Sequence, residues 1–103
     1  MTEEMSVQND ASAHRLTLMI DGLPAAFIEY YLFGRVAIAT HTEVITGHEG
    51  RGMGTKMACR TLDRFDGEGY QVVPVCGFLA EQIRRHPQYQ HLLTPYCRRI
   101  FAV

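Results

Sequence analysis

At 103 residues, the chain is long enough for one hydrophobic core and too short for two, so any functional site must share that core. A content of 47% hydrophobic and 20% charged residues, without long charged blocks, is typical of a globular protein and excludes a disordered one. The formal net charge of -1 gives no general attraction to nucleic acid or to an anionic membrane, and no apolar run is long enough to span a bilayer.

The first stretch of the chain predicts no folded structure. Residues 1–13 are polar, small and aperiodic, so we interpret them as a flexible tail ahead of a single domain at 14–103. The N-terminus is acidic where a secretion signal would be basic and then apolar. The cysteines, Cys59, Cys76 and Cys97, contain no CxxC pair. We therefore expect a cytoplasmic protein with reduced thiols, no disulfide framework and no metal site.

The next segments predict an antiparallel meander. Residues 14–20 are rich in strand formers and are followed by an Asp-Gly turn. Two more segments with strand composition, at 25–32 and 35–44, flank Phe33-Gly34 and indicate a β-hairpin.

Strict alternation along residues 35–44 predicts which side chains are neighbours. One face would carry Val36, Ile38, Thr40, Thr42 and Val44. The other face would carry His41 and Glu43 side by side. An imidazole next to a carboxylate can act as a general base, while the carboxylate orients the ring or binds a cationic acceptor. The alternative is an ordinary solvated surface pair.

Residues 46–54 form a glycine-rich loop with four glycines, directly before a segment whose apolar residues have helical spacing. Because first-turn N–H groups lack helical partners and glycines let the backbone approach a ligand closely, this loop is a candidate site for a diphosphate. Arg51 and Lys56 can add charge-assisted hydrogen bonds. The spacing fits neither the dinucleotide motif nor the P-loop. The alternative is that the glycines form only an irregular turn.

The second half of the chain predicts helices around one more strand. A short apolar strand at 70–75 places Cys76 at its C-terminal end, and a helix at 77–85 should stop before Pro87. Residues 96–103 are interpreted as a final strand. An antiparallel β-meander followed by helix, strand and helix predicts an α+β fold with helices packed against the sheet.

Several motifs carry a family resemblance. The stretch Glu49–Gly54 resembles the pyrophosphate-binding signature of GNAT acetyltransferases, Q/R-x-x-G-x-G/A, and it follows a meander as expected. The motifs HTEV (His41–Val44), VVPVCGF (Val72–Phe78) and RRHPQY (Arg84–Tyr89) are similar to those of the small GNAT-like acetyltransferases.

This resemblance implies a minimal GNAT-like fold and an N-acetyltransferase that moves an acetyl group from acetyl-CoA to an amine on a small molecule or a protein. The cofactor would contact Val44, Glu49, Gly50, Arg51, Gly52, Met53, Gly54, Thr55, Lys56 and Cys76. Glu49 stands where the signature has Gln or Arg, and its carboxylate would repel a diphosphate unless it points away. The chain is also too short for the helices with which larger GNAT enzymes build an acceptor pocket.

Cys76 is a candidate catalytic residue together with His41 and Glu43. It precedes a helix N-terminus, whose dipole would stabilise a thiolate that accepts the acetyl group covalently. The alternative is a small apolar side chain lining the cofactor site. The basic cluster at 84–86 can contact an acidic acceptor or the 3′-phosphate of CoA, or it is a solvated helix end.

The sequence is compatible with several functions. The acetyl group can pass directly to the amine or through Cys76. A different class of function is a non-catalytic CoA- or acyl-CoA-binding regulatory module, which would bind the cofactor without turnover. A third is an interaction domain that has kept the fold and lost the cofactor.

Overall fold

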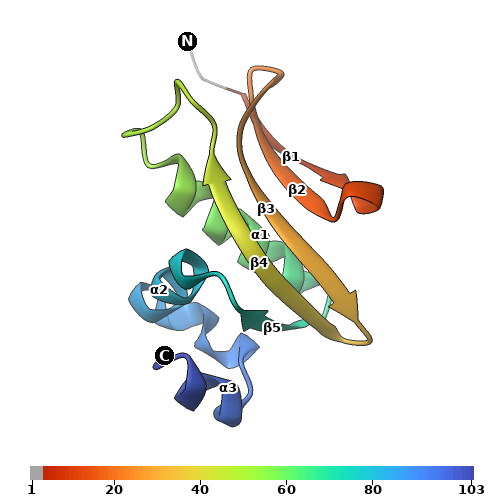
Figure 1. The fold of residues 1–103 in the computed structure, drawn as a ribbon, viewed down its shortest axis with the longest axis vertical. Helices are drawn as coiled ribbons and strands as arrows, with labels where there is room; N and C mark the ends of the chain where they lie inside the picture. Colours follow the sequence, from red (N-terminus) through yellow and green to blue (C-terminus); the bar gives the residue numbers. More distant parts are fainter. Residues whose placement is uncertain (1–3) are drawn as a thin grey trace.

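Within residues 4–103, which the computed structural model describes, a five-stranded sheet in sequential order forms the scaffold (Figure 1). Its strands are β1 (Met5–Asp10), β2 (Arg15–Ile20), β3 (Leu23–Phe33), β4 (Val36–Val44) and β5 (Gln71–Pro74). Strands β1 to β4 pair antiparallel, and β5 pairs parallel with β4. The α+β fold expected from the sequence is confirmed.

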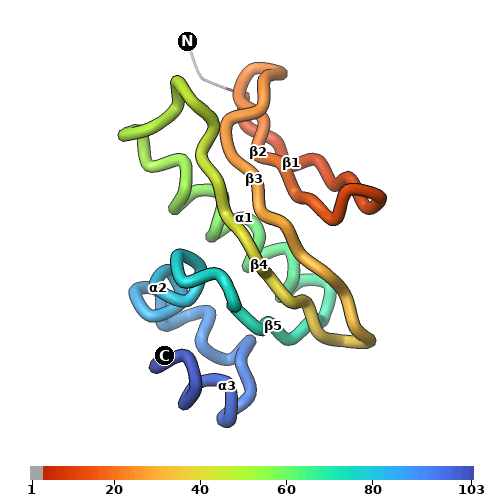
Figure 2. The backbone as a smooth tube through the Cα atoms, in the orientation of Figure 1, coloured from red at the N-terminus to blue at the C-terminus, as the bar shows by residue number. Residues whose placement is uncertain are grey.

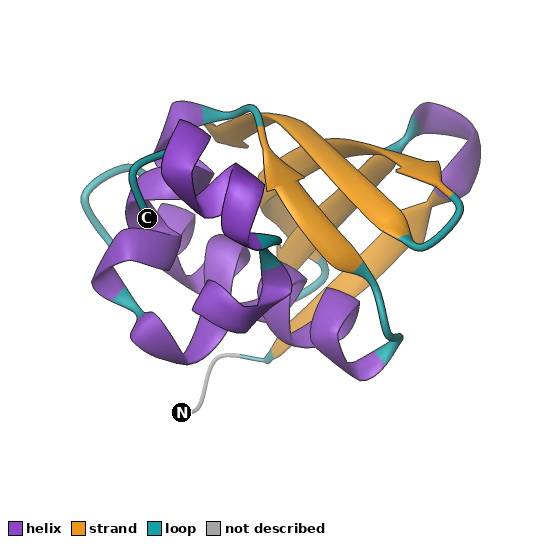
Figure 3. Cartoon of the chain, turned by 90° about the horizontal axis from the view of Figure 1, so that it is seen from below, coloured by secondary structure: helices purple, strands orange, loops and turns teal. Residues whose placement is uncertain are grey.

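The helices pack mainly against one face of this sheet. They are α1 (Met53–Gly67), α2 (Gly77–Arg85) and α3 (Pro95–Ile100), with short 3-10 helices η1 (Ala11–Ala13) and η2 (Pro87–Leu92). In Figure 3 most helices gather to the left of and below the strands. Burial alternates accordingly along β2, where Leu16, Leu18 and Ile20 are buried and the residues that alternate with them are half-buried. Within residues 4–103, one face of the sheet therefore remains without a full helical cover.

The long helix α1 makes the crossover between the parallel strands β4 and β5. Its buried positions, including Met57 and Leu62, recur at helical spacing and meet the buried face of the sheet. Leu79 and Ile83 of α2 join the same core. The hydroxyl of Tyr89 in η2 donates a 2.7 Å hydrogen bond to the Asp63 carboxylate of α1, and burial raises the pKa of Tyr89. These contacts hold α2 and η2 beside α1.

The expectation of a flexible tail at residues 1–13 is wrong for residues 5–13. Met5–Asp10 forms the edge strand β1, in register with β2, and η1 follows it. Met5 and Val7 pack against the core, and the hydroxyl of Tyr30 donates a 2.6 Å hydrogen bond to the side chain of Asn9. Pairing with β2 thus outweighs the polar composition of this segment. Residues 1–3, also assigned to the tail, lie outside the described residues.

The expected final strand is also wrong, because Pro95–Ile100 forms the helix α3. The Thr94 side chain caps this helix by accepting a hydrogen bond from the Cys97 N–H at 3.2 Å, and Pro95 occupies the first turn. Threonine at the N-cap followed by proline is a typical helix start. No helix in the described part of the chain is long and apolar enough to cross a membrane.

A β-bulge in β4 changes which side chains share a face. His41 pairs with Glu29, whereas Ala39 pairs with Tyr30, so Thr40 is an extra residue without a partner across the strands. Its hydroxyl donates to the Glu29 carbonyl at 3.4 Å. Beyond the bulge the alternation is therefore reversed. The expectation that Thr42 and Val44 share a face with Val36 and Ile38 is therefore wrong.

Because of this bulge, Thr42 and Val44 lie on the helix-covered face. Thr42 pairs with the fully buried Ile28, and side chains directly opposite each other point to the same face. His41 and Glu43 lie on the other face, as neighbours.

Candidate functional site

The candidate site begins where β4 and β5 separate. Their parallel pairing ends at Ala39 and Pro74, and the Cys76 N–H donates one more hydrogen bond to the Ala39 carbonyl at 3.0 Å. Beyond this point β4 continues to Val44, while the chain leaves β5 and turns into α2 (Figure 2). No strand of the described chain therefore pairs with this edge of β4 past Ala39.

Backbone groups of β4 point toward this uncovered edge. The Ile45 N–H donates to the Ala25 carbonyl at 2.8 Å, on the β3 side. Because neighbouring residues of a strand direct their N–H and C=O groups to opposite edges, those of Thr42 and Val44 point away from β3. The uncovered edge thus offers donors and acceptors to a ligand that carries amide groups.

Cys76 lies beside this edge. It is the N-cap residue of α2, and its half-buried thiol donates a hydrogen bond to the Thr42 hydroxyl at 3.3 Å. The predicted position of Cys76, after a strand and before a helix, is confirmed. Its partner Thr42 was missed by sequence reasoning, because no sequence signal revealed the bulge that turns Thr42 toward Cys76.

His41 and Glu43 form the expected pair on the open face of the sheet. Their side chains meet at 3.2 Å and are 51% and 54% exposed. The ring of Phe27 lies 6.0 Å from that of His41, between centroids. The pair is therefore separated from the Cys76 thiol by the sheet, although His41 and Thr42 are consecutive residues. Side chains from both faces of β4 thus flank the same uncovered edge.

The glycine-rich loop has the backbone geometry that an anion site requires. Gly47, Gly50 and Gly52 have φ values of 99°, 76° and 72°, in the left-handed region that favours glycine. Gly52 is the N-cap residue of α1 and provides no side-chain cap, so the first-turn N–H groups keep their capacity to bind an anion. The expected succession of strand, loop and helix is confirmed.

Residues around the helix start differ in what they can offer a ligand. Met53 is buried in the core, so its side chain is not available to a ligand. Thr55 and Lys56 are exposed on the first turn of α1, and Glu49, Gly50 and Arg51 are exposed in the loop.

Glu49 turns its carboxylate onto the loop itself. Oε2 accepts a hydrogen bond from the Gly47 N–H at 2.8 Å. Hydrogen bonds from its own backbone N–H and from that of Gly47 hold the pKa of Glu49 below its usual value. The loop therefore already contains one internal anion. A bound diphosphate must share the loop with this charge or displace it.

If the loop holds the diphosphate of CoA, as the resemblance implies, changing Glu49 to glutamine should tighten that binding. Glutamine keeps an oxygen that can accept from Gly47 and removes the negative charge, so we expect about a fivefold lower Kd. Isothermal calorimetry with CoA measures this change. As a control, Glu68→Gln removes a charge at the opposite end of α1, where Glu68 pairs with Arg64. Equal affinity of Glu49→Gln and wild type would show that the carboxylate does not oppose the ligand.

An aromatic side chain joins the loop to the Cys76 region. The ring of Phe78, in the first turn of α2, lies against Gly54, so a Cβ at Gly54 would be 2.8 Å from Phe78 Cζ. Glycine at position 54 therefore permits the close approach of the two helix starts. Phe78 is 40% exposed and Val75 is also exposed. An apolar surface thus flanks Cys76 on the side of the loop.

The basic cluster at 84–86 takes part in structural contacts. Arg84 and Arg85 both form ion pairs with Glu81, and Arg84 also donates to the carbonyls of Phe101 and Ala102. The His86 ring contacts the Gln82 carbonyl at 2.7 Å. These partners favour a role in fixing the C-terminus against α2.

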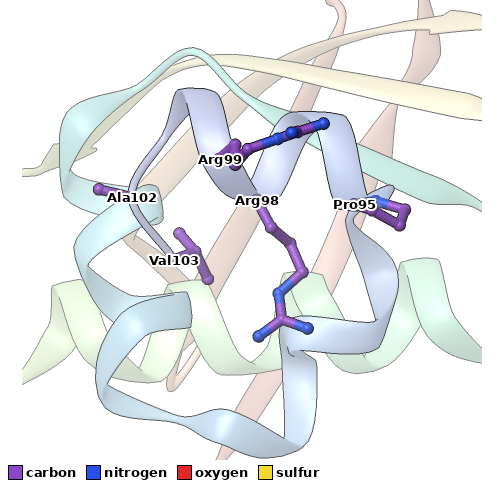
Figure 4. Close-up of a pocket in the computed structure, with 5 residues that line it drawn as sticks. All are labelled: Pro95, Arg98, Arg99, Ala102 and Val103. Atoms are coloured by element: carbon purple, nitrogen blue, oxygen red, sulfur yellow. The ribbon is translucent and has the colours of Figure 1, made fainter.

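Two cavities among the described residues do not include Cys76 in their lining. One of about 350 Å³ is formed by the C-terminal segment (Figure 4). Its lining residues are Pro95, Arg98, Arg99, Ala102 and Val103. Another, of about 620 Å³, lies along α1 and is lined by Met5, Lys56, Cys59, Arg60 and Asp63. Only the second includes a predicted cofactor residue, Lys56. The candidate site is therefore defined by the β4 edge and the loop.

Comparison with known proteins adds one match. A family model described as GCN5-related N-acetyltransferase matches residues 15–92. The matched segment runs from β2 through η2 and contains the uncovered β4 edge, the glycine-rich loop, α1 and Cys76. No curated protein matches the chain.

Proposed function

Since the chain belongs to the GCN5-related N-acetyltransferase family, we propose that it transfers the acetyl group of acetyl-CoA to an amine. The observation that carries this proposal is the approach of the two helix starts. Cys76 bonds to Ala39 at one end of the uncovered β4 edge, and the glycine-rich loop follows Val44 at the other end. Phe78 packs on Gly54 and so joins the two helix starts. The proposed diphosphate site, an edge for an amide-bearing arm and a thiol would thus follow one another.

The cofactor fits this succession of groups. The loop and the first turn of α1 would hold the diphosphate through backbone N–H groups, with Lys56 supplying a positive charge. The amide-bearing arm of CoA would pair with the backbone of Thr42 and Val44, as a strand pairs with a sheet edge. The thioester would then lie beside Cys76 and the apolar surface of Val75 and Phe78.

The open face of the sheet would receive the amine. His41 would take a proton from the amine as it attacks the thioester, and Glu43, at 3.2 Å, would orient the imidazole and attract a cationic acceptor. In the direct route the nitrogen attacks the acetyl group of the cofactor. In the covalent route Cys76 accepts the acetyl group first.

A non-catalytic role is the second candidate, and Glu49 favours it. A carboxylate bound to the loop N–H groups opposes the diphosphate, which fits a module that binds CoA weakly and reversibly. Such a module would sense acyl-CoA without consuming it. An acetyltransferase would consume acetyl-CoA when an acceptor is present, whereas the module would bind acetyl-CoA and leave it intact.

An acceptor screen tests the proposed function. The protein is incubated with acetyl-CoA and a panel of lysine-containing peptides, polyamines and small primary amines, and both free CoA and acetylated products are measured. We expect CoA release that depends on an acceptor and matches the amount of product. Binding of acetyl-CoA without turnover across the panel would favour the regulatory module.

A further inference from the structure

The contact between Cys76 and Thr42 is a specific feature of the uncovered β4 edge. The thiol donates to the Thr42 hydroxyl at 3.3 Å, and both side chains are half-buried. The contact depends on the bulge at Thr40, because without it Thr42 would point to the opposite face. The strand is thus locally shaped to bring a hydroxyl to this sulfur.

A hydroxyl is suited to both charge states of a thiol. It accepts a hydrogen bond from S–H, and after rotation it donates its own hydrogen to a thiolate. Hydrogen bonds to charged groups are stronger than those between neutral groups. A hydroxyl in this position therefore supports the sulfur before and after it loses its proton.

We propose that Thr42 is a positioning residue for Cys76, which holds the sulfur at the uncovered edge of β4 and stabilises its thiolate for attack on the thioester. This inference rests on the covalent route of the proposed function. Thr42 lies in the HTEV motif between His41 and Glu43, and the inference gives its side chain a role separate from that pair.

The transfer step balances without any further reactant. The Cys76 sulfur attacks the acetyl carbon, so a new S–C bond forms while the S–C bond to CoA breaks, and the thiol proton ends on the released CoA thiol. The amine nitrogen then attacks acetyl-Cys76. A C–N bond forms as the S–C bond breaks, and an amine proton returns to the Cys76 sulfur.

The chain contains its own reference thiols for a test. Cys59 and Cys97 are half-buried like Cys76. Burial raises the pKa of the Cys59 thiol, and Cys97 lies in α3. Among the described residues, the hydrogen bond to Thr42 comes from Cys76 and not from Cys59 or Cys97, so the reactivity of these two thiols reports on the fold of each variant.

The experiment compares wild type with Thr42→Val, which keeps the shape and removes the hydroxyl, and with Thr42→Ser, which keeps the hydroxyl. Alkylation by iodoacetamide is followed at each cysteine by peptide mass spectrometry, without cofactor. Acetylation of Cys76 by acetyl-CoA, without acceptor, is followed by intact mass. We expect both reactions at Cys76 to slow about tenfold in Thr42→Val and to stay near the wild-type rate in Thr42→Ser. Cys59 and Cys97 should react equally in all three proteins.

Wild-type reactivity of Cys76 in Thr42→Val would overturn the inference, as would equal slowing in Thr42→Ser. Acetyl transfer to an amine without any acetyl-Cys76 would overturn it too, and would leave the proposed function intact through the direct route. If the protein binds no acetyl-CoA, the proposed function fails, and alkylation still decides whether Thr42 governs the sulfur.

Discussion

Replacing Gly52 with valine is expected to weaken acetyl-CoA binding by about thirtyfold, the loss expected when charge-assisted hydrogen bonds to phosphate are removed. Gly52 is the N-cap residue of α1 with a φ of 72°. A β-branched side chain there is strained, and it stands in front of the first-turn N–H groups that would receive the diphosphate. Calorimetric titration with acetyl-CoA measures the loss.

Gly34→Val is the matched control for this variant. Gly34 also has a positive φ, 56°, and as at Gly52 no atom of the described residues lies within 4 Å of an added Cβ. It lies in the β3–β4 hairpin, away from the loop. We therefore expect a similar cost in thermal stability and unchanged binding. Equal affinity of the Gly52→Val variant and wild type would exclude the loop as the diphosphate site.

Replacing His41 with alanine is expected to lower the rate of acetyl transfer about a hundredfold, the lower end of what a general base contributes. The affinity for acetyl-CoA should stay unchanged, because the imidazole lies on the open face of the sheet and the loop does not depend on it. Steady-state kinetics with an active acceptor would show the change in kcat, and calorimetry would show the unchanged Kd.

His91→Ala provides the control for the loss of an exposed imidazole. His91 pairs with Asp66 at 3.0 Å and is 58% exposed, so it resembles His41 in partner and environment but lies in η2, against α1. Its removal should leave transfer intact. A wild-type rate in His41→Ala would remove this residue as the base and direct attention to a water molecule or to the Cys76 route.

The parts of the fold that follow from local patterns were predictable from the sequence. Two hairpins, the glycine-rich loop before α1, and Cys76 between β5 and α2 all rest on turn chemistry and periodicity within short segments. The pairing of His41 with Glu43 follows from the same alternation, because both residues lie beyond the bulge.

The parts that depend on pairing between distant segments were not predictable in this way. Met5–Asp10 has a polar composition and forms β1 only because β2 offers it a free edge. The bulge at Thr40 arises from the register of β4 on β3, and it alone brings Thr42 to Cys76. Helix α3 is a different case, because a local signal for it was present in the sequence. Thr94 and Pro95 are a typical helix start, but the residues after them have strand composition and were interpreted as a strand.

The bulge is therefore the feature that gives the candidate site its two sides. It turns Thr42 toward the thiol on the helix-covered face and turns His41 and Glu43 to the open face, next to the same edge. A donor held on one side and an amine arriving from the other can meet there.

Acetyl-CoA is proposed to bind along the glycine-rich loop and the uncovered β4 edge. Titration of ¹⁵N-labelled protein with acetyl-CoA, followed by NMR, tests it at each residue. We expect saturable shifts of the amide signals of Gly50, Gly52 and Gly54, together with those of Thr42, Val44 and Cys76. Absence of shifts, or shifts confined to the cavity at Pro95–Val103, would contradict it.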